Sequence, residues 1–269
     1  MISYTGEITS LKDLNDVSQS AQKNNIKLSG CFQYYRGHGS STYKLISSIA
    51  RFFSDTKSLE DAENKIIADL KTETRKAKMN DYFFVPAIAN GFDEDWYWLT
   101  QTQHLGIPTR LLDWTLCSEI ALYFAVADDK CKNKDGDFWI FFVPDKFNIH
   151  NQPEIISSIK PLQNDKDLFI SIPVHWNKNY EKNEPQRNML SQQGKFFIRS
   201  LLQSLIPLEN ETFFQKYLLR YKIPAANKNK ILEELTQLNY SNHTIYKTVN
   251  KTMNDIKEKL ILAYNLKTK

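Results

Sequence analysis

Apolar residues recur at intervals of three and four in several stretches of the chain, which is the spacing that places them on one face of a helix. Helices are therefore predicted over residues 9–24, from a capping Ser58 to about Lys78, over residues 93–103, and from a start between Asp113 and Thr115. At that last start, either side chain can accept hydrogen bonds from the free backbone N–H groups of the first turn.

Three shorter stretches favour strands. Residues 31–35 are rich in aromatic side chains, residues 138–143 are apolar on both faces, and residues 195–200 contain the apolar run Phe196-Phe-Ile198. Because residues 138–143 lack a polar face, we expect a central strand there. Residues 36–41 contain two glycines and are predicted to form a tight loop, while residues 144–190 are less regular.

The order of these elements mixes strands and helices without a regular strand-helix-strand alternation. This order indicates an α+β fold, with a small, bent, mixed or antiparallel sheet flanked by helices. We expect one domain over residues 1–269, with the motifs in a core at 31–200. Residues 211–265 are predicted to form a helical C-terminal part, with breaks at Pro224 and at 239–241.

The composition supports a folded protein, since 41% of the 269 residues are hydrophobic and only eight are glycine and nine proline. The formal net charge is +4, but basic and acidic residues are interspersed, which favours a solvated surface over a nucleic-acid-binding face. The chain begins without the pattern of a signal peptide, and no apolar run is long enough to span a membrane. We therefore expect no membrane contact and a cytoplasmic location.

Several kinds of chemistry are disfavoured by the residues present. Cys31, Cys117 and Cys131 are odd in number and form no Cys-x-x-Cys pair, which argues against a disulfide framework or a zinc site. No His or acidic residues stand at the spacing of metal ligands, so we expect no metal. The glycine-rich dinucleotide motif, the P-loop, Gly-x-Ser-x-Gly and His-Glu-x-x-His are all missing. A nuclease is disfavoured because no carboxylate cluster for Mg²⁺ is evident.

The densest polar cluster of the chain is the run from residue 104 to residue 115. It contains His104, Thr109, Arg110, Asp113, Trp114 and Thr115. In a ligand site, Trp114 would stack on a base or a nicotinamide ring. In a structural corner, Arg110 would pair with Asp113 across a turn and Trp114 would fill the core. His104 is near a predicted helix end, which favours its cationic form; it acts as an acid/base or ligand-binding group, or only bonds a backbone carbonyl.

Arg36 is a second candidate, because it follows the aromatic strand and precedes Gly37 and Gly39. A guanidinium has a rigid fork of donors that suits phosphate or carboxylate. Flanking glycines would let a ligand approach the backbone. The alternative is a buried arginine that ties the strand to a carboxylate such as Asp113. A weaker signal is Gln193, whose amide, between Gln192 and Gly194, would contact a ligand or brace a loop.

These motifs resemble the FRG domain, a family named after a Phe/Tyr-Arg-Gly motif. The resemblance rests on Tyr35-Arg36-Gly37, the run from Gln103 to Thr115, Ala121-Leu-Tyr-Phe-Ala125, Asp135-Gly136, and Arg187 with Gln193-Gly194-x-Phe196. It covers roughly residues 8–250. Tyr35 stands where the name of the family gives Phe, and both residues are aromatic.

The order of the same motifs is also similar to ADP-ribosyltransferases of the Arg–Ser–Glu type. That similarity implies that Arg36 holds the phosphates and ribose of NAD, that Thr115 shapes the nicotinamide pocket, and that Gln193 takes the position of the Glu. Gln cannot supply the negative charge that the oxocarbenium-like transition state needs. Either Asp113 takes that role, or the chain is a binding module on a transferase-like scaffold.

Two hypotheses therefore remain open. In the first, the protein is an NAD-handling enzyme of ADP-ribosyltransferase or NAD-glycohydrolase type, in phage defence or as a toxin-like effector, with NAD as substrate and no resident cofactor. Its catalytic residues are Arg36, Asp113 and Gln193, and its acceptor is a protein or a nucleic acid. In the second, it is a non-catalytic module that binds a nucleotide, a nucleic acid or a protein.

Overall fold

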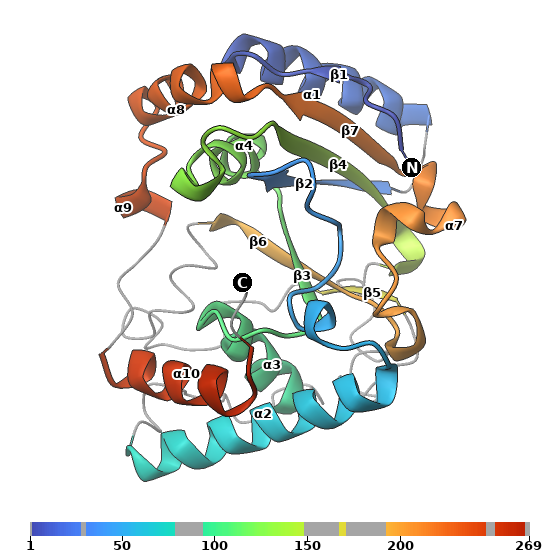
Figure 1. The fold of residues 1–269 in the computed structure, drawn as a ribbon. Helices are drawn as coiled ribbons and strands as arrows, with labels where there is room; N and C mark the ends of the chain where they lie inside the picture. The colour runs from blue at the N-terminus through green and yellow to red at the C-terminus, as the bar shows by residue number, and fades with distance from the viewer. Residues whose placement is uncertain are drawn as a thin grey trace.

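The fold is an α+β arrangement in which helices cover a mixed sheet (Figure 1). The computed structural model describes residues 2–27, 31–78, 94–147, 167–170, 192–245 and 251–266. Its α-helices are α1 (Leu11–Lys27), α2 (Thr56–Lys76), α3 (Glu94–His104), α4 (Ser118–Val126), α7 (Thr212–Gln215), α8 (Lys228–Gln237), α9 (Asn242–Ile245) and α10 (Lys251–Ala263). Short 3₁₀ turns are η1 (Ile49–Phe52), η2 (Asp129–Cys131), η3 (Asp145–Phe147), η8 (Leu201–Gln203), η9 (Leu208–Asn210) and η10 (Ala225–Asn227).

Seven strands of the described residues form one sheet in the order β1-β7-β4-β2-β3-β6-β5. They are β1 (Gly6–Glu7), β2 (Cys31–His38), β3 (Leu111–Thr115), β4 (Gly136–Pro144), β5 (Leu168–Ile170), β6 (Gly194–Ile198) and β7 (Leu218–Ile223). Only the β1–β7 pair is parallel, and the other pairs are antiparallel. The expected mixed sheet is therefore confirmed.

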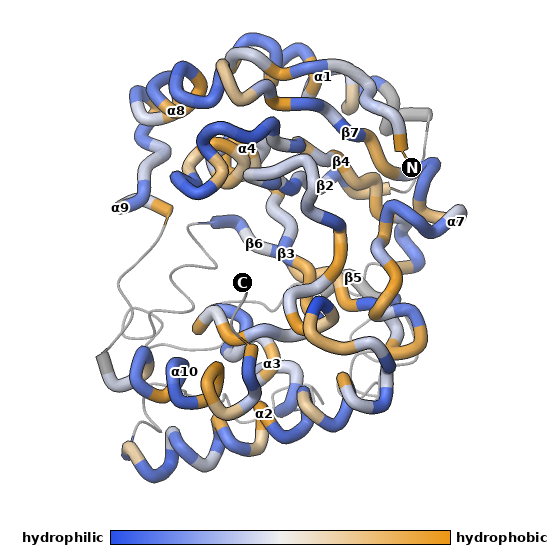
Figure 2. Tube along the Cα trace, viewed as in Figure 1, coloured by the Kyte–Doolittle hydropathy of each residue, from blue (hydrophilic) through white to orange (hydrophobic). Residues whose placement is uncertain are grey.

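Strand β4 is the central strand that its apolar sequence predicts, and all of its residues are buried. Phe138, Ile140 and Phe142 lie in the hydrophobic cluster that includes residues of α1, α4 and α8. Trp139 and Phe141 alternate with them and lie in a second cluster on the other face. Figure 2 shows a largely hydrophobic β4, with the hydrophilic outer turns of α1 and α8 at the edge of the molecule. Burial on both faces explains why this strand lacks the polar alternation of a half-exposed one.

The sheet divides between β2 and β3, the feature that creates the candidate site. Strand β2 pairs with β4 along its whole length, but it pairs with β3 only at Tyr35 and Thr115. Beyond that pair the two strands separate, and β3 continues with β6 instead. Figure 1 shows the two groups, with β1, β7, β4 and β2 in one half and β6 and β5 in the other.

Each half of the sheet has its own helical cover. Helices α1, α4 and α8 pack with the β2, β4 and β7 half, whereas α2, α3 and α10 share a cluster with β3 and β6. Helix α4 lies so close to β2 that a Cβ atom at Gly37 would be 1.8 Å from the carbonyl oxygen of Ala121. Helices α4 and α3 therefore lie on the two sides of the division of the sheet.

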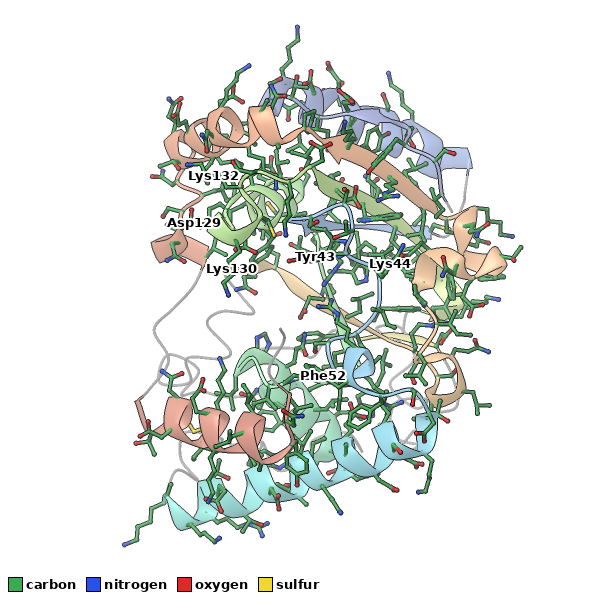
Figure 3. All side chains as sticks on the ribbon, in the orientation of Figure 1. Tyr43, Lys44, Phe52, Asp129, Lys130 and Lys132 are labelled. Carbon is green, nitrogen blue, oxygen red and sulfur yellow. The ribbon has the colours of Figure 1, made fainter. Side chains whose placement is uncertain are left out.

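The loop that follows β2 is held beside the turn that follows α4. The buried Lys228 ammonium donates to the carbonyl oxygens of Gly39 and Cys131, at 2.6 and 3.0 Å. The hydroxyl of Tyr43 lies 3.3 Å from the sulfur of Cys131. Figure 3 labels Tyr43 and, to its left, Lys130 of the turn after α4. These contacts fix the C-terminal end of β2, the strand that carries the Phe/Tyr-Arg-Gly motif.

Two predictions near the site are wrong. The helix predicted to start between Asp113 and Thr115 begins only at Ser118, and Asp113–Thr115 lie in β3. The Thr115 hydroxyl does accept from a backbone N–H, that of Cys117, but it lies at a strand end. Residues 36–38 continue β2 instead of forming a tight loop, because they pair with the first residues of β4.

Two further differences concern more distant segments. The C-terminal part predicted as helical contains β7, which joins β4 to β1 inside the sheet. The N-cap of α2 is Asp55 rather than the predicted Ser58, and its carboxylate accepts from the backbone N–H of Ser58. Asp and Ser side chains cap helices in the same way.

Arg187 and most of residues 144–190 lie outside the described residues. No helix among the described residues is long and apolar enough to cross a membrane.

Candidate functional site

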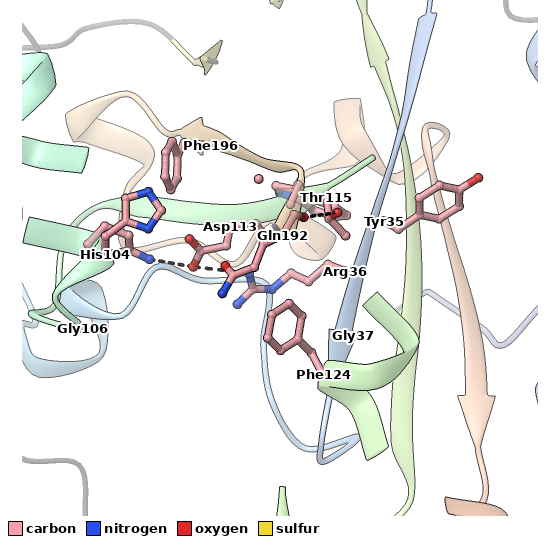
Figure 4. Close-up of a pocket in the computed structure, with 13 residues that line it drawn as sticks. Tyr35, Arg36, Gly37, His104, Gly106, Asp113, Thr115, Phe124, Gln192 and Phe196 are labelled. Carbon is pink, nitrogen blue, oxygen red and sulfur yellow. Dashed lines mark hydrogen bonds and ion pairs between the residues drawn. The ribbon is translucent and has the colours of Figure 1, made fainter. Parts of the chain in front are cut away.

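A cavity of about 370 Å³ lies where β2 and β3 separate (Figure 4). Residues of β2, α3, β3, α4 and β6, together with Gln192 before β6, form its walls. The lining residues are Tyr35, Arg36, Gly37, Gln103, His104, Gly106, Asp113, Trp114, Thr115, Phe124, Gln192, Gly194 and Phe196. This volume is within the range of small-molecule sites.

Arg36 bridges the gap between the two separated strands. Continued antiparallel pairing from Tyr35 and Thr115 would bring Gly37 opposite Asp113, a pair that does not form. Instead, Nη1 of Arg36 donates to the backbone oxygen of Asp113 and lies 3.9 Å from its carboxylate oxygen Oδ2. Arg36 Nε donates to Nε2 of His38 at 3.0 Å. The guanidinium therefore supplies the hydrogen bond that the sheet loses here.

Burial of this guanidinium has an electrostatic consequence. Desolvation lowers the pKa of Arg36 to about 10, with a further lowering by Arg51 and an opposing effect of Asp113. Arg36 remains cationic at neutral pH. Its remaining nitrogen, Nη2, has no hydrogen-bond partner within the part of the chain that the structure describes. A cation with a free donor inside a cavity is suited to an anionic ligand.

Asp113 faces the cavity, and its side chain is 53% exposed there. Its Oδ2 accepts a hydrogen bond of 2.6 Å from Nε2 of Gln103. The carboxylate is open to the cavity on one side and surrounded by protein on the others. This desolvation raises the pKa of Asp113, against the opposing effects of Arg36 and Gln103.

Gln103 is in turn held by Thr109. The Thr109 hydroxyl donates to Oε1 of Gln103 at 2.6 Å and accepts from the backbone N–H of Leu111 at 3.1 Å. Thr109 itself is fully buried and does not line the cavity. It contacts the site through Gln103, a residue that we did not single out from the sequence.

His104 lines the same cavity beside Asp113, where its ring packs edge-on against Phe196 with 5.4 Å between ring centres. Burial lowers the pKa of His104 to about 4. The expectation of a cationic His104 is therefore wrong, because desolvation outweighs the effect of the helix end. Its Nε2 is buried and has no hydrogen-bond partner among the described residues.

Thr115 brings the segment before β6 to the cavity. Its hydroxyl donates to the backbone oxygen of Gln192 at 2.7 Å, so Gln192 rather than Gln193 lines the cavity. Gln193 has a positive φ of 47° and an exposed side chain. Because the backbone bends at this point, Gln192 takes the place at the cavity that the sequence predicts for Gln193. Two adjacent glutamines give no sequence signal that distinguishes them.

Three other candidate residues make contacts that stabilise the fold. Trp114 contributes to the lining of the cavity, but its ring packs on Phe141 in a core cluster, with 5.2 Å between ring centres. Arg110 is buried and pairs with Glu63, with 2.6 Å between Nε and Oε2, rather than with Asp113. Gly37 lines the cavity, but its missing side chain makes room for α4 rather than for a ligand.

Phe124 and Phe196 are cavity residues that sequence reasoning did not assign to the site. Phe124 projects from α4 toward Arg36, and Phe196 from β6 toward His104 (Figure 4). Both belong to motifs noted in the sequence. Apolar spacing does not distinguish a phenylalanine that lines a cavity from one in the core. No group of three or more His, Cys, Asp or Glu side chains in the described ranges could hold a metal ion.

No curated protein and no solved structure matches the chain. A family model matches residues 33–134, the segment that carries Arg36, His104 and Asp113. Gln192, just before β6, and Phe196, in β6, also line the cavity and lie beyond the matched segment. The family is the FRG domain, and the match supports the FRG resemblance of this segment.

Proposed function

We propose that the cavity binds NAD and that the protein cleaves its bond between ribose and nicotinamide, as an enzyme of ADP-ribosyltransferase type. One observation carries the proposal. The guanidinium of Arg36 and the carboxylate of Asp113 face one cavity from the two strands that separate there. A cation for phosphate and an anion for a developing positive charge are the two groups that this reaction needs.

In the proposed reaction, the C–N bond breaks and its electron pair moves to the nicotinamide nitrogen, which neutralises that ring. Positive charge then develops on C1 of the ribose, and Asp113 stabilises it. Water, or an acceptor group of a protein or nucleic acid, adds to C1 and releases a proton. Arg36 holds a phosphate through its free Nη2, and Phe124 and Phe196 supply apolar walls for the rings.

Two properties of the site support Asp113 in this role. The carboxylate is oriented by Gln103 and is open to the cavity, so a ligand reaches it without a rearrangement. A charge held in a fixed orientation also stabilises a transition state more than a freely moving charge in water does. The amide that lines the cavity, Gln192, cannot replace it, because an amide carries no charge.

A second candidate function is a non-catalytic module that binds a nucleotide. The observation that favours it is that Asp113 is already engaged by Arg36 and Gln103, while Gln192 stands near the position expected for a glutamate. Such a site would hold a phosphate and a ribose without breaking the bond between ribose and base.

The two candidates differ in what happens to labelled NAD. We expect the pure protein to release nicotinamide, with ADP-ribose either free or, when cell extract is added, attached to an acceptor. Binding of NAD or ADP-ribose by calorimetry without release of nicotinamide, alone and with extract, would contradict the enzyme and support the module.

We further propose that the enzyme acts in the cytoplasm, where NAD is available, as a toxin-like effector or in phage defence. Expression in growing bacteria should then lower cellular NAD and slow growth. The Asp113→Asn variant at the same expression level should do neither.

A further inference from the structure

The side chains around Asp113 form a directed chain of hydrogen bonds. The backbone N–H of Leu111 donates to the Thr109 hydroxyl, which donates to Oε1 of Gln103, and Nε2 of Gln103 donates to Oδ2 of Asp113. The two side-chain bonds are both 2.6 Å long. The chain begins at a buried backbone group and ends at the carboxylate in the cavity.

We propose that Gln103 is a positioning residue which, held in one orientation by Thr109, fixes the Asp113 carboxylate toward the cavity and favours its charged form. As a positioning role for the reaction, this inference rests on the proposed function. The hydrogen-bond chain itself does not depend on NAD and can be tested in the free protein.

The orientation of the Gln103 amide follows from both of its neighbours. A glutamine amide has an acceptor end and a donor end of nearly the same shape. The Thr109 hydroxyl already accepts from Leu111, so its proton is available for the acceptor end of the amide. The donor end then meets the carboxylate. The reversed amide would place its oxygen against Asp113, which is repulsive.

The other neighbours of Asp113 do not supply this role. Arg36 from β2 is the charged group that faces it, but its Nη1 donates to the Asp113 backbone oxygen and is 3.9 Å from the carboxylate. His104 from α3 is neutral because of its burial. Phe124 of α4 and Phe196 of β6 complete the walls with apolar surface. Within the described part of the chain, Gln103 is therefore the side chain that donates a direct hydrogen bond to the carboxylate, beside the backbone N–H of Asp113 itself.

The test is the pH midpoint of Asp113, followed by NMR in the full-length protein with ¹³C-labelled aspartate. Asp113→Asn identifies its signal. Gln103→Met removes the donor at similar length, and Thr109→Val removes the hydroxyl that orients it. Thr109→Ser keeps that hydroxyl. Thr102→Val is the matched control, because it also removes a buried hydroxyl, one that donates to the Trp98 carbonyl within α3.

We expect the Asp113 midpoint to move upward by about one pH unit in Gln103→Met, since a lost hydrogen bond to the charged form disfavours that form. Thr109→Val should move it in the same direction, and Thr109→Ser and Thr102→Val should leave it at the native value. An unchanged midpoint in Thr109→Val would overturn the inference, even if Gln103→Met failed to fold.

Turnover of NAD separates this inference from the proposed function. If both hold, Gln103→Met lowers kcat more than it raises KM, because the fixed charge acts mainly in the transition state. If the midpoint moves as expected but the native protein releases no nicotinamide, the positioning of the carboxylate stands and the NAD reaction fails. If nicotinamide is released but the midpoint of every variant is native, the reaction stands and the role of Gln103 fails.

Discussion

Arg36 donates from Nη1 to the backbone oxygen of Asp113 and also lies 3.9 Å from the carboxylate of the same residue. These two residues are far apart in the sequence, on strands that separate where the cavity begins. One guanidinium thus closes the break in the sheet, while its other terminal nitrogen remains available to a ligand. Arg36 is therefore expected to contribute both to the stability of the fold and to ligand affinity, and a substitution can separate these two contributions.

Arg36→Lys keeps the charge but loses the planar fork, so it cannot reach His38 and Asp113 at the same time. We expect the affinity for ADP-ribose, measured by calorimetry, to fall at least about tenfold. We also expect a loss of about 1–3 kcal/mol in the free energy of unfolding, the size of one or two buried hydrogen bonds. Native affinity together with that stability loss would show that Arg36 has a structural role alone.

Gly37→Ala tests the close packing of α4 on β2. The new Cβ would meet the backbone of Ala121 at 1.8 Å, and backbone cannot move aside as a side-chain end can. We expect a loss of about 3 kcal/mol or more in urea-induced unfolding. Gly6→Ala is the control, because its nearest neighbour would be a Tyr221 ring atom at 3.6 Å. Equal stability of the two variants would mean that α4 does not approach β2 so closely.

Gln192→Glu and Gln193→Glu place the same charge at adjacent positions, only the first of which lines the cavity. Gln192→Glu should raise NAD turnover, because it adds a carboxylate where the transition state is positive. Gln193→Glu should leave turnover unchanged, since its side chain is exposed outside the lining. The reverse pattern would show that the loop before β6 is arranged differently when NAD is bound.

The sequence predicts those features of the site that depend on neighbouring residues, and it does not predict those that depend on distant contacts. The central strand follows from the unbroken apolar run Phe138–Val143, and the helix predicted over residues 93–103 agrees with α3, whereas β3 was not predicted as a strand. The sequence predicts a helix start at Asp113–Thr115 because both side chains suit N-caps, but pairing with β6 places these residues in β3. The role of Gln103 depends on contacts with Thr109 and Asp113 that only the folded turn creates.

Strand β7 shows the same limit at the level of the fold. Leu218–Ile223 is short and lies between helical segments, so its sequence did not separate it from them. Its strand conformation comes from pairing with β4, almost eighty residues earlier in the chain. Tertiary contacts of this kind override the weak preferences of a six-residue segment.

Asp113→Asn should stabilise the protein at neutral pH. Burial raises the pKa of Asp113 in the folded state, so the folded protein binds this proton more tightly than the unfolded chain does. The contribution of the carboxyl to stability is thus greatest at acidic pH and falls as the pH rises through the folded pKa. Asn imitates the neutral form and avoids this loss. The Tm difference between variant and native should therefore grow from acidic to neutral pH; a lower Tm of the variant at neutral pH would contradict this.

The most direct measurement of the central claim is nicotinamide release from labelled NAD by the native protein and by Asp113→Asn, with both shown to be folded. We predict release by the native protein and a rate at least about a hundredfold lower for the variant, the usual loss when a preorganised electrostatic group is removed. Equal release by both would remove Asp113 from the reaction. No release by the native protein, alone or with cell extract, would contradict the enzyme itself.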